Sequence, residues 1–247
     1  MLDKAEFKSL YINIFEKNGL NEFINDNIID KMFKMSDYMV QINEHMNLTA
    51  ITDAEGIIAK HLADSVTISR FIPENATVCD VGCGGGFPSL PLAIVRSDVR
   101  IIGIDSTEKR INYVNDSAKL LELDNLSAVS GRAEDLSRSA PYREQFDVCV
   151  ARAVANLPIL SELCIPFVKV GGKFIAMKGK FTEEEFDLSA NGCQKLGCEP
   201  LTASKAHRFE LHSATSSEER AIIELSKLKQ TPSQYPRNYS QIKKKPL

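Results

Sequence analysis

A glycine-rich loop constrains this chain more than any other segment. Gly82, Gly84 and Gly86 alternate in it, after an apolar run that ends in Asp80-Val81, and a helix-like segment opens at Pro88. Glycine lets a backbone turn sharply and approach a ligand without a Cβ in the way. Proline is favoured in a first helical turn, and the free N–H groups of that turn suit an anionic group. The segment therefore predicts a strand, a ligand-binding loop and a helix.

A second apolar run supplies an acidic partner for this loop. Ile101–Ile104 ends in Asp105, about 20 residues after the loop, the spacing at which an acid meets ribose hydroxyls in nucleotide-binding units. A dinucleotide fingerprint, G-x-G-x-x-G, would need glycine at the position of Phe87. The observed G-x-G-x-G fits S-adenosylmethionine better. The loop alone leaves two alternatives, another nucleotide-binding fold or a plain turn.

Length and composition are those of an ordinary globular protein. The chain has 247 residues, 43% hydrophobic and 26% charged, enough for one good-sized core with or without a small appended unit. No apolar run approaches the roughly 20 residues that cross a bilayer, and the acidic, amphipathic start is no signal peptide. Of the six cysteines, Cys193 and Cys198 lack a partnering pair for zinc. We expect a cytoplasmic protein without metal or membrane contact.

Positive charge gathers at the C-terminal end. The net charge is −3, yet residues 227–247 hold no acid and six cations: Lys227, Lys229, Arg237, Lys243, Lys244 and Lys245. A basic tail on an acidic body suggests local contact with an anionic polymer. A merely solubilising tail is an equal alternative.

The hydrophobic rhythm divides the chain into three parts. Apolar residues recur at helical spacing in residues 1–71, which predicts an N-terminal helical extension. Strands and helices then alternate through residues 72–226, the predicted methyltransferase domain, and residues 227–247 form the basic C-terminal tail. Such alternation predicts a mostly parallel sheet with helices on both faces. Together with the glycine loop, which fits S-adenosylmethionine, it indicates an α/β, Rossmann-like S-adenosylmethionine-dependent methyltransferase fold with a seven-stranded sheet.

Five parallel strands are predicted at 77–80, 101–105, 126–130, 146–150 and 173–177. The helices between them include 88–96, 108–121 and 156–168. Gly171-Gly172 is predicted as the turn into the fifth strand. Two further strands, 196–203 and 220–226, are predicted as antiparallel additions at the sheet edge.

Ligands of such sheets bind beyond the carboxyl ends of the strands. Backbone N–H groups of the glycine loop, at Gly82 and Gly84, are expected to meet the methionine carboxylate. Asp105 should accept hydrogen bonds from the ribose hydroxyls. After the third strand, Ala133 and Glu134 are well placed to bind the adenine edge, although an acid at a helix start is also common. Phe87 should pack against the cofactor.

The residues after the fourth strand limit the methyl acceptor. Enzymes that methylate exocyclic amines often carry Asn/Asp-Pro-Pro-Tyr/Phe there, whereas this chain has Ala151-Arg152-Ala153-Val154. Cys149 lies inside the strand without the context of a cytosine C5 nucleophile. Without a nucleophile or a strong base, the pocket suits an acceptor with a free lone pair, such as guanine N7. Arg152 is the candidate to hold the guanine edge or a phosphate, with a structural salt bridge as its alternative.

Several separate motifs, in order from about residue 40 to the end, give the chain a family resemblance. It resembles the bacterial 16S ribosomal RNA guanine-N7 methyltransferases of the RsmG or GidB type. The resemblance rests on Asn47-Leu48-Thr49, Lys60–Ser65, Asp80–Pro88, Asp105-Ser106 with Lys109-Arg110, Ala151-Arg152-Ala153, Lys178-Gly179-Lys180 and the tail Thr231–Arg237 followed by Lys244–Leu247.

The resemblance implies methyl transfer from S-adenosylmethionine to N7 of one guanine, nucleotide 527 of 16S rRNA, without a covalent enzyme intermediate. The substrate would be 16S rRNA or the small ribosomal subunit, and a monomer is expected. Implied cofactor contacts are Gly82, Phe87, Ala133, Glu134 and Arg152. Implied RNA-side or pocket-shaping residues are His61, Asp64, Arg110, Lys178 and Lys180, with helix packing as the alternative for His61. An enzyme of the same fold acting on a small molecule or a protein is the remaining alternative.

Overall fold

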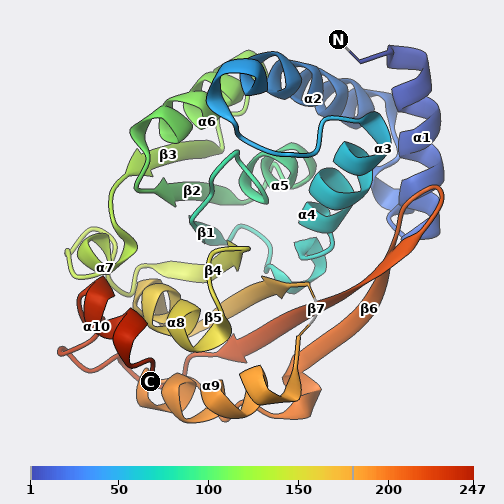
Figure 1. Ribbon diagram of the computed structural model, residues 1–247. Helices are drawn as coiled ribbons and strands as arrows, with labels where there is room; N and C mark the ends of the chain where they lie inside the picture. Colours follow the sequence, from blue (N-terminus) through green and yellow to red (C-terminus); the bar gives the residue numbers. More distant parts are fainter. Residues whose placement is uncertain (1, 180) are drawn as a thin grey trace.

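A seven-stranded sheet runs through the middle of the molecule, in the order β3-β2-β1-β4-β5-β7-β6 (Figure 1). The computed structural model describes residues 2–179 and 181–247. Strands β1 to β5 pair in parallel, and β7 is antiparallel to both β5 and β6. The strands are β1 Thr77–Val81, β2 Arg100–Asp105, β3 Leu126–Ser130, β4 Phe146–Arg152, β5 Val168–Lys178, β6 Ala206–His212 and β7 Ser217–Ser226. The predicted fold, a mostly parallel sheet of this class, is confirmed.

Two details of the predicted strands are wrong. Residues 196–203 are no strand, because Gly197 turns the chain at a φ of 103° and Cys198 makes only an isolated bridge to Lys227. The sixth strand is β6 instead. Gly171-Gly172 does not precede the fifth strand but lies inside β5, where Gly171 has a φ of 87° and the pairing with β4 shifts register.

Helices cover both faces of the sheet. The N-terminal ones are α1 Lys4–Lys17, α2 Asp26–Met46, α3 Ala54–Gly56 and α4 Asp64–Val66, with a π-helical segment Ile57–Ala63 between the last two. The others are α5 Ser89–Val95, α6 Glu108–Leu120, α7 Ala133–Leu136, α8 Leu157–Cys164, α9 Glu183–Lys195 and α10 Tyr239–Lys244. Short 3₁₀ turns lie at Asn21–Phe23, Ser69–Phe71, Ile165–Phe167 and Ala203–Lys205. No helix in the described part of the chain is long and apolar enough to span a membrane.

The N-terminal helices share a core with the sheet. Phe7 and Met32, from α1 and α2, belong to the same buried cluster as Val78 of β1 and Ile101 of β2. The side chains of Asp3, Asn25 and Asp53 accept hydrogen bonds from backbone N–H groups at the starts of α1, α2 and α3, which satisfies donors that a helix start leaves open. This packing holds the π-helical segment against the carboxyl end of β4, where Arg152 donates to the Lys60 carbonyl.

The C-terminal segment also packs on the domain. The Lys227 side chain is fully buried, donates to the carbonyls of Ile165 and Val168, and pairs with Glu144 at 2.7 Å. Arg237 likewise pairs with the fully buried carboxylate of Glu162. Two of the six predicted cations of the tail are therefore structural, while the lysines at 243–245 are exposed.

Candidate active site

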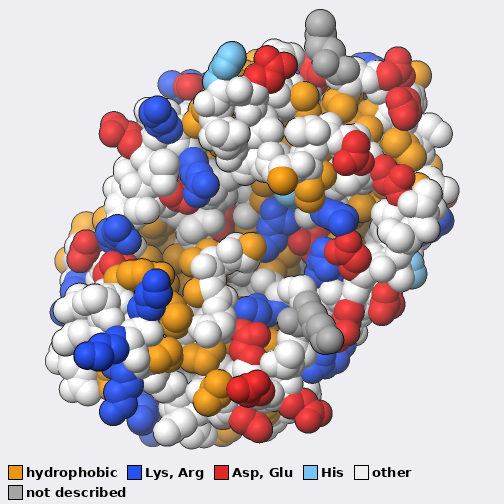
Figure 2. Space-filling view, viewed as in Figure 1, with side chains coloured by type: hydrophobic (Ala, Val, Ile, Leu, Met, Phe, Trp, Pro, Cys, Tyr) orange, Lys and Arg blue, Asp and Glu red, His pale blue; other side chains and the backbone are white. Residues whose placement is uncertain are grey.

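Two cavities open beyond the carboxyl ends of the parallel strands. The first, here the loop cavity, has a volume of about 220 Å³ and lies between the glycine loop and the starts of α6 and α7. The second, the arginine cavity, has a volume of about 360 Å³ and lies between β4, β5, β7 and the π-helical segment. Figure 2 shows a hollow near the middle of this face, with Lys and Arg side chains along its margin.

The loop cavity brings together four residues that the sequence predicted for cofactor binding: Gly82, Asp105, Ala133 and Glu134. They come from the ends of three different strands, β1, β2 and β3. Arg110, predicted on the RNA side, also lines this cavity, with a guanidinium nitrogen 3.7 Å from the Asp105 carboxylate. The ends of these three strands therefore meet at one cavity, whereas β4 and β5 lead into the arginine cavity, so the five strand ends do not surround a single pocket.

Asp105 is held rigidly at the end of β2. Its Oδ1 accepts from the N–H of Thr107 at 2.8 Å, and its Oδ2 accepts from the N–H of Gly84 at 3.1 Å. The residue is only 8% exposed. The side chain thus presents a preoriented carboxylate to the cavity, as a pair of ribose hydroxyls requires.

The glycine loop is closely packed at its first position. Gly82 has a φ of 75°, and a Cβ on it would lie 2.5 Å from Cγ2 of Val154. The positive φ and this contact both require glycine. Such a cradle, beside the Asp105 carboxylate, fits S-adenosylmethionine.

Most N–H groups of this loop already have partners. Those of Gly82 and Cys83 donate to the Ile104 carbonyl, and those of Gly86 and Phe87 donate to the Cys83 carbonyl. Since Gly84 donates to Asp105, the predicted contact between the loop N–H groups and the methionine carboxylate finds these five donors occupied. Neither Gly84 nor Phe87 lines either cavity.

Arg152, at the end of β4, is the centre of the arginine cavity. Its NH1 donates to the carbonyl of Lys60 at 2.8 Å and to Oδ2 of Asp64 at 3.0 Å. The other Asp64 oxygen, Oδ1, lies 3.3 Å from Nε of Arg220 on β7. One nearly buried carboxylate therefore holds two guanidinium groups in one cavity wall.

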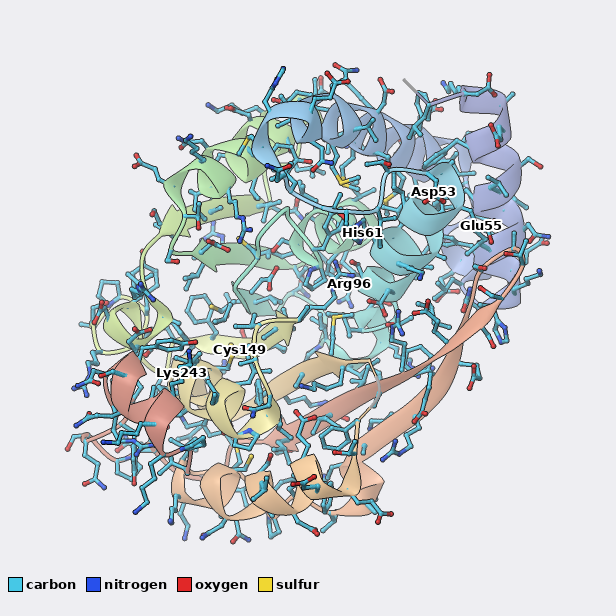
Figure 3. All side chains as sticks on the ribbon, in the orientation of Figure 1. Asp53, Glu55, His61, Arg96, Cys149 and Lys243 are labelled. Atoms are coloured by element: carbon cyan, nitrogen blue, oxygen red, sulfur yellow. The ribbon has the colours of Figure 1, made fainter. Side chains whose placement is uncertain are left out.

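His61 and Phe87 form an aromatic support beneath this cluster. Their rings stack with centroids 4.5 Å apart, and the Arg152 guanidinium carbon lies 5.3 Å from the Phe87 centroid. Phe87 therefore contacts the arginine cluster rather than the loop cavity. His61 projects from the π-helical segment toward the middle of the molecule (Figure 3).

His61 is a neutral, hydrogen-bonded imidazole. Burial, and after it the positive charge of Arg152, lower its pKa to about 4. Arginine can only donate, so Nδ1 is the acceptor of a long contact of 3.5 Å from Arg152. Nε2 then carries the proton and donates to the Thr49 hydroxyl at 2.8 Å. Both ring nitrogens are thus engaged inside the protein.

Of the two lysines predicted to bind RNA, Lys178 and Lys180, the structure describes the first. Lys178, at the end of β5, lines the arginine cavity, is 13% exposed in its side chain and pairs with Glu185 at 2.7 Å. Its ammonium group also donates to the Ala155 carbonyl at 3.1 Å. Lys180 lies outside the described residues.

Sequence reasoning missed Arg220 and Tyr239. Arg220 lines the arginine cavity and Tyr239 the loop cavity. Arg220 follows Glu218 and Glu219 in a run of charged residues, which by itself indicates a segment that faces solvent. Only the return of β7 beside β5 brings it to Asp64. Tyr239 lies in residues 227–247, which the composition identifies only as a basic tail.

A short connection after β4 separates the two cavities. Ala153, which has a φ of 56°, lines the arginine cavity, and the next residue, Val154, lines the loop cavity. A ligand group in the loop cavity is thus one residue of backbone away from the arginine cavity.

Comparison with known proteins gives the same assignment. The family model described as rRNA small subunit methyltransferase G matches residues 28–214. The Ribosomal RNA small subunit methyltransferase G of Acetivibrio thermocellus is 40% identical over 247 residues, all of both chains. A protein of the same name from Lactobacillus delbrueckii subsp. bulgaricus is 42% identical over 85% of this chain and 87% of its own.

Solved structures are similar in fold alone. NSun6 from Pyrococcus horikoshii superposes with a TM-score of 0.54 at 16% identity, over 68% of this chain and 52% of that one. A putative transferase from the same organism, PH0793, gives 0.52 at 15% identity over 70% and 67%. The cofactor is S-adenosylmethionine. The match of the family model over residues 28–214 and the 40% identity over the full length together establish that this chain belongs to the rRNA small subunit methyltransferase G family.

Proposed function

We propose that this protein methylates N7 of a single guanine, nucleotide 527 of 16S rRNA, by direct transfer from S-adenosylmethionine without a covalent enzyme intermediate. The observation that carries the proposal is the arginine cavity. It adjoins the loop cavity and presents the donors of Lys60, Arg152, Lys178 and Arg220. The family membership favours an RNA acceptor over a small molecule or a protein.

The cofactor would lie in the loop cavity. Asp105 would accept hydrogen bonds from the ribose hydroxyls, and Ala133 and Glu134 would contact the adenine. The methionine half would pass Gly82, whose missing Cβ makes room for the Val154 side chain in the cavity wall. S-adenosylmethionine supplies a methyl group on a positively charged sulfur. The connection at Ala153-Val154 would keep that methyl at the border of the arginine cavity.

The chain's own residues suit an acceptor that needs no deprotonation. The imidazole of His61, with its pKa near 4 and both nitrogens engaged, is a weak general base. The Asp64 carboxylate is bound by Arg152 and Arg220. Cys149 is fully buried inside β4 and cannot reach a substrate as a nucleophile. Guanine N7 has a free lone pair, so alignment of the acceptor would supply most of the rate.

Arg152 would orient the target base. A guanine edge offers O6 as an acceptor beside N7, and an arginine is the usual donor to that edge. Arg152 and Lys178 could equally bind a flanking phosphate, which fixes position without reading sequence. A flipped or unpaired guanine could enter the arginine cavity, while Arg110, the predicted Lys180 and the exposed lysines at 243–245 would attract the RNA backbone.

The test is a transfer assay with labelled cofactor on 16S rRNA and on small subunits that lack the modification. The modified base is then mapped by mass spectrometry and by chain cleavage at N7-methylguanosine. N7-methylguanosine at nucleotide 527 alone would support the proposal. Label on another base, or at another position, would contradict it. Label on protein or on small molecules, with none on RNA, would favour the other acceptor class.

A further inference from the structure

The C-terminal arm, residues 231–247, is anchored beside the cofactor side of the sheet. Arg143 donates to the carbonyls of Thr231 and Tyr235 at 2.8 and 2.9 Å, and Arg138 donates to the Pro236 carbonyl. Arg237 pairs with the fully buried Glu162 of α8 at 2.6 Å. These bonds hold α10 against α8, beside α7 (Figure 1).

The short helix α10 has one buried residue and one at the loop cavity. Ile242 is fully buried in the core cluster of α8, whereas Tyr239, three residues earlier, lines the loop cavity together with Ala133 and Glu134. Tyr239 is 38% exposed. Since Ile242 and Arg237 anchor the arm, the tyrosine ring is not needed for that purpose.

An aromatic ring at this place matches a purine. Ala133 and Glu134 follow β3, on the adenine side of the cavity, and Asp105 lies toward the ribose. A partly exposed tyrosine ring offers a flat apolar face and a hydroxyl, and aromatic rings bind bases by stacking. The arm thereby adds a wall that the strand ends alone do not supply.

We infer that Tyr239 binds the adenosine half of S-adenosylmethionine, so that the C-terminal arm is part of the cofactor site. The inference rests on the cofactor and not on the proposed guanine acceptor. It predicts that changes in the arm weaken cofactor binding even when no RNA is present.

Isothermal titration of the full-length protein with S-adenosylmethionine, without RNA, tests this inference. Tyr239→Ala should raise the Kd at least about fivefold, the size of one lost base-stacking contact. Tyr239→Phe separates the two contacts: a Kd near wild type assigns the ring face, and a raised Kd adds the hydroxyl. Gln241→Ala, at an exposed position on the same helix, is the matched control and should bind like wild type.

Tyr239→Leu guards against an effect of lost packing. It keeps apolar bulk at the cavity and removes the ring, so its Kd should also rise. Circular dichroism and thermal unfolding without cofactor check that each variant is folded. A Kd for Tyr239→Ala or Tyr239→Leu within twofold of wild type would overturn the inference. Failure of the guanine-N7 proposal would instead appear in RNA mapping and leave these titrations unchanged.

Discussion

Substitution of Asp64 is the strongest single test of the arginine cavity. It is 9% exposed in its side chain and bridges Arg152 and Arg220, whose side chains are 15% and 16% exposed. Asp64→Asn keeps the shape but leaves one acceptor oxygen and turns an NH₂ donor toward a guanidinium. The guanidinium groups of Arg152 and Arg220 then have no negatively charged group between them.

The expected cost follows from these contacts. One hydrogen bond to a charged group contributes about 1.5–3 kcal/mol, and breaking a fully buried pair costs about 3–5 kcal/mol. Because both guanidiniums keep some solvent contact, we expect Asp64→Asn to lower the free energy of unfolding by about 2–3 kcal/mol. In a chain of this length that lowers Tm by roughly 4–12 °C. The loosened Arg152 should slow methyl transfer by about 100-fold.

Urea unfolding followed by circular dichroism measures the stability change, and labelled transfer to 16S rRNA measures the rate. The cofactor Kd should stay near wild type, because Asp64 lines the arginine cavity and not the loop cavity. Glu218→Gln is the matched control. Glu218 pairs with Arg220 at 2.9 Å but is 43% exposed, so its loss should cost less than about 1 kcal/mol. If Asp64→Asn matched wild type in both stability and rate, the bridging role would be refuted.

Three further predictions concern the aromatic support and the loop cavity. The pKa of His61 is lowered to about 4, so below pH 6.5 the unfolded chain binds a proton that the folded chain does not bind. The free energy of unfolding should therefore be highest above pH 6.5 and fall toward pH 4. Urea unfolding at pH 7.5 and 4.5 should differ by about 2–3 kcal/mol more in wild type than in His61→Asn, and equal differences would contradict the assignment. Gly82→Ala places a Cβ 2.5 Å from Val154 at a φ of 75° and should weaken cofactor binding at least about tenfold by titration; wild-type affinity would show that the cradle is not used. Asp105→Ala should weaken cofactor binding at least about tenfold, since charged hydrogen bonds to the ribose are lost, and an unchanged Kd would remove Asp105 from the ribose site.

Local sequence was sufficient for the elements that form the loop cavity. The glycine spacing, the acid at the end of the second apolar run and the pattern of the five parallel strands all depend on neighbours in the chain. Parallel strands bring their carboxyl ends to one edge, so Gly82, Asp105, Ala133 and Glu134 could be placed together without knowing any long-range contact.

The edge of the sheet could not be predicted in the same way. The sixth strand, Ala206–His212, mixes charged and apolar residues because its outer side is open to solvent. Leu196, Cys198 and Leu201 gave a stronger apolar signal, but they are buried beneath the sheet and not within it. Hydrophobicity reports burial, and only the surrounding structure decides whether a buried segment is also extended and paired.

The arginine cavity was decided by the tertiary structure. Asp64 and Arg152 are 88 positions apart, and Arg220 reaches the same carboxylate from β7. The sequence by itself determined the cofactor loop, the five parallel strands along the chain and the family, because turn chemistry and strand periodicity are local. The partners of charged side chains depend on which surfaces lose water when helices, sheet and C-terminal arm pack together. That same packing buried Lys227, paired Arg237 with Glu162 and brought Tyr239 to the loop cavity.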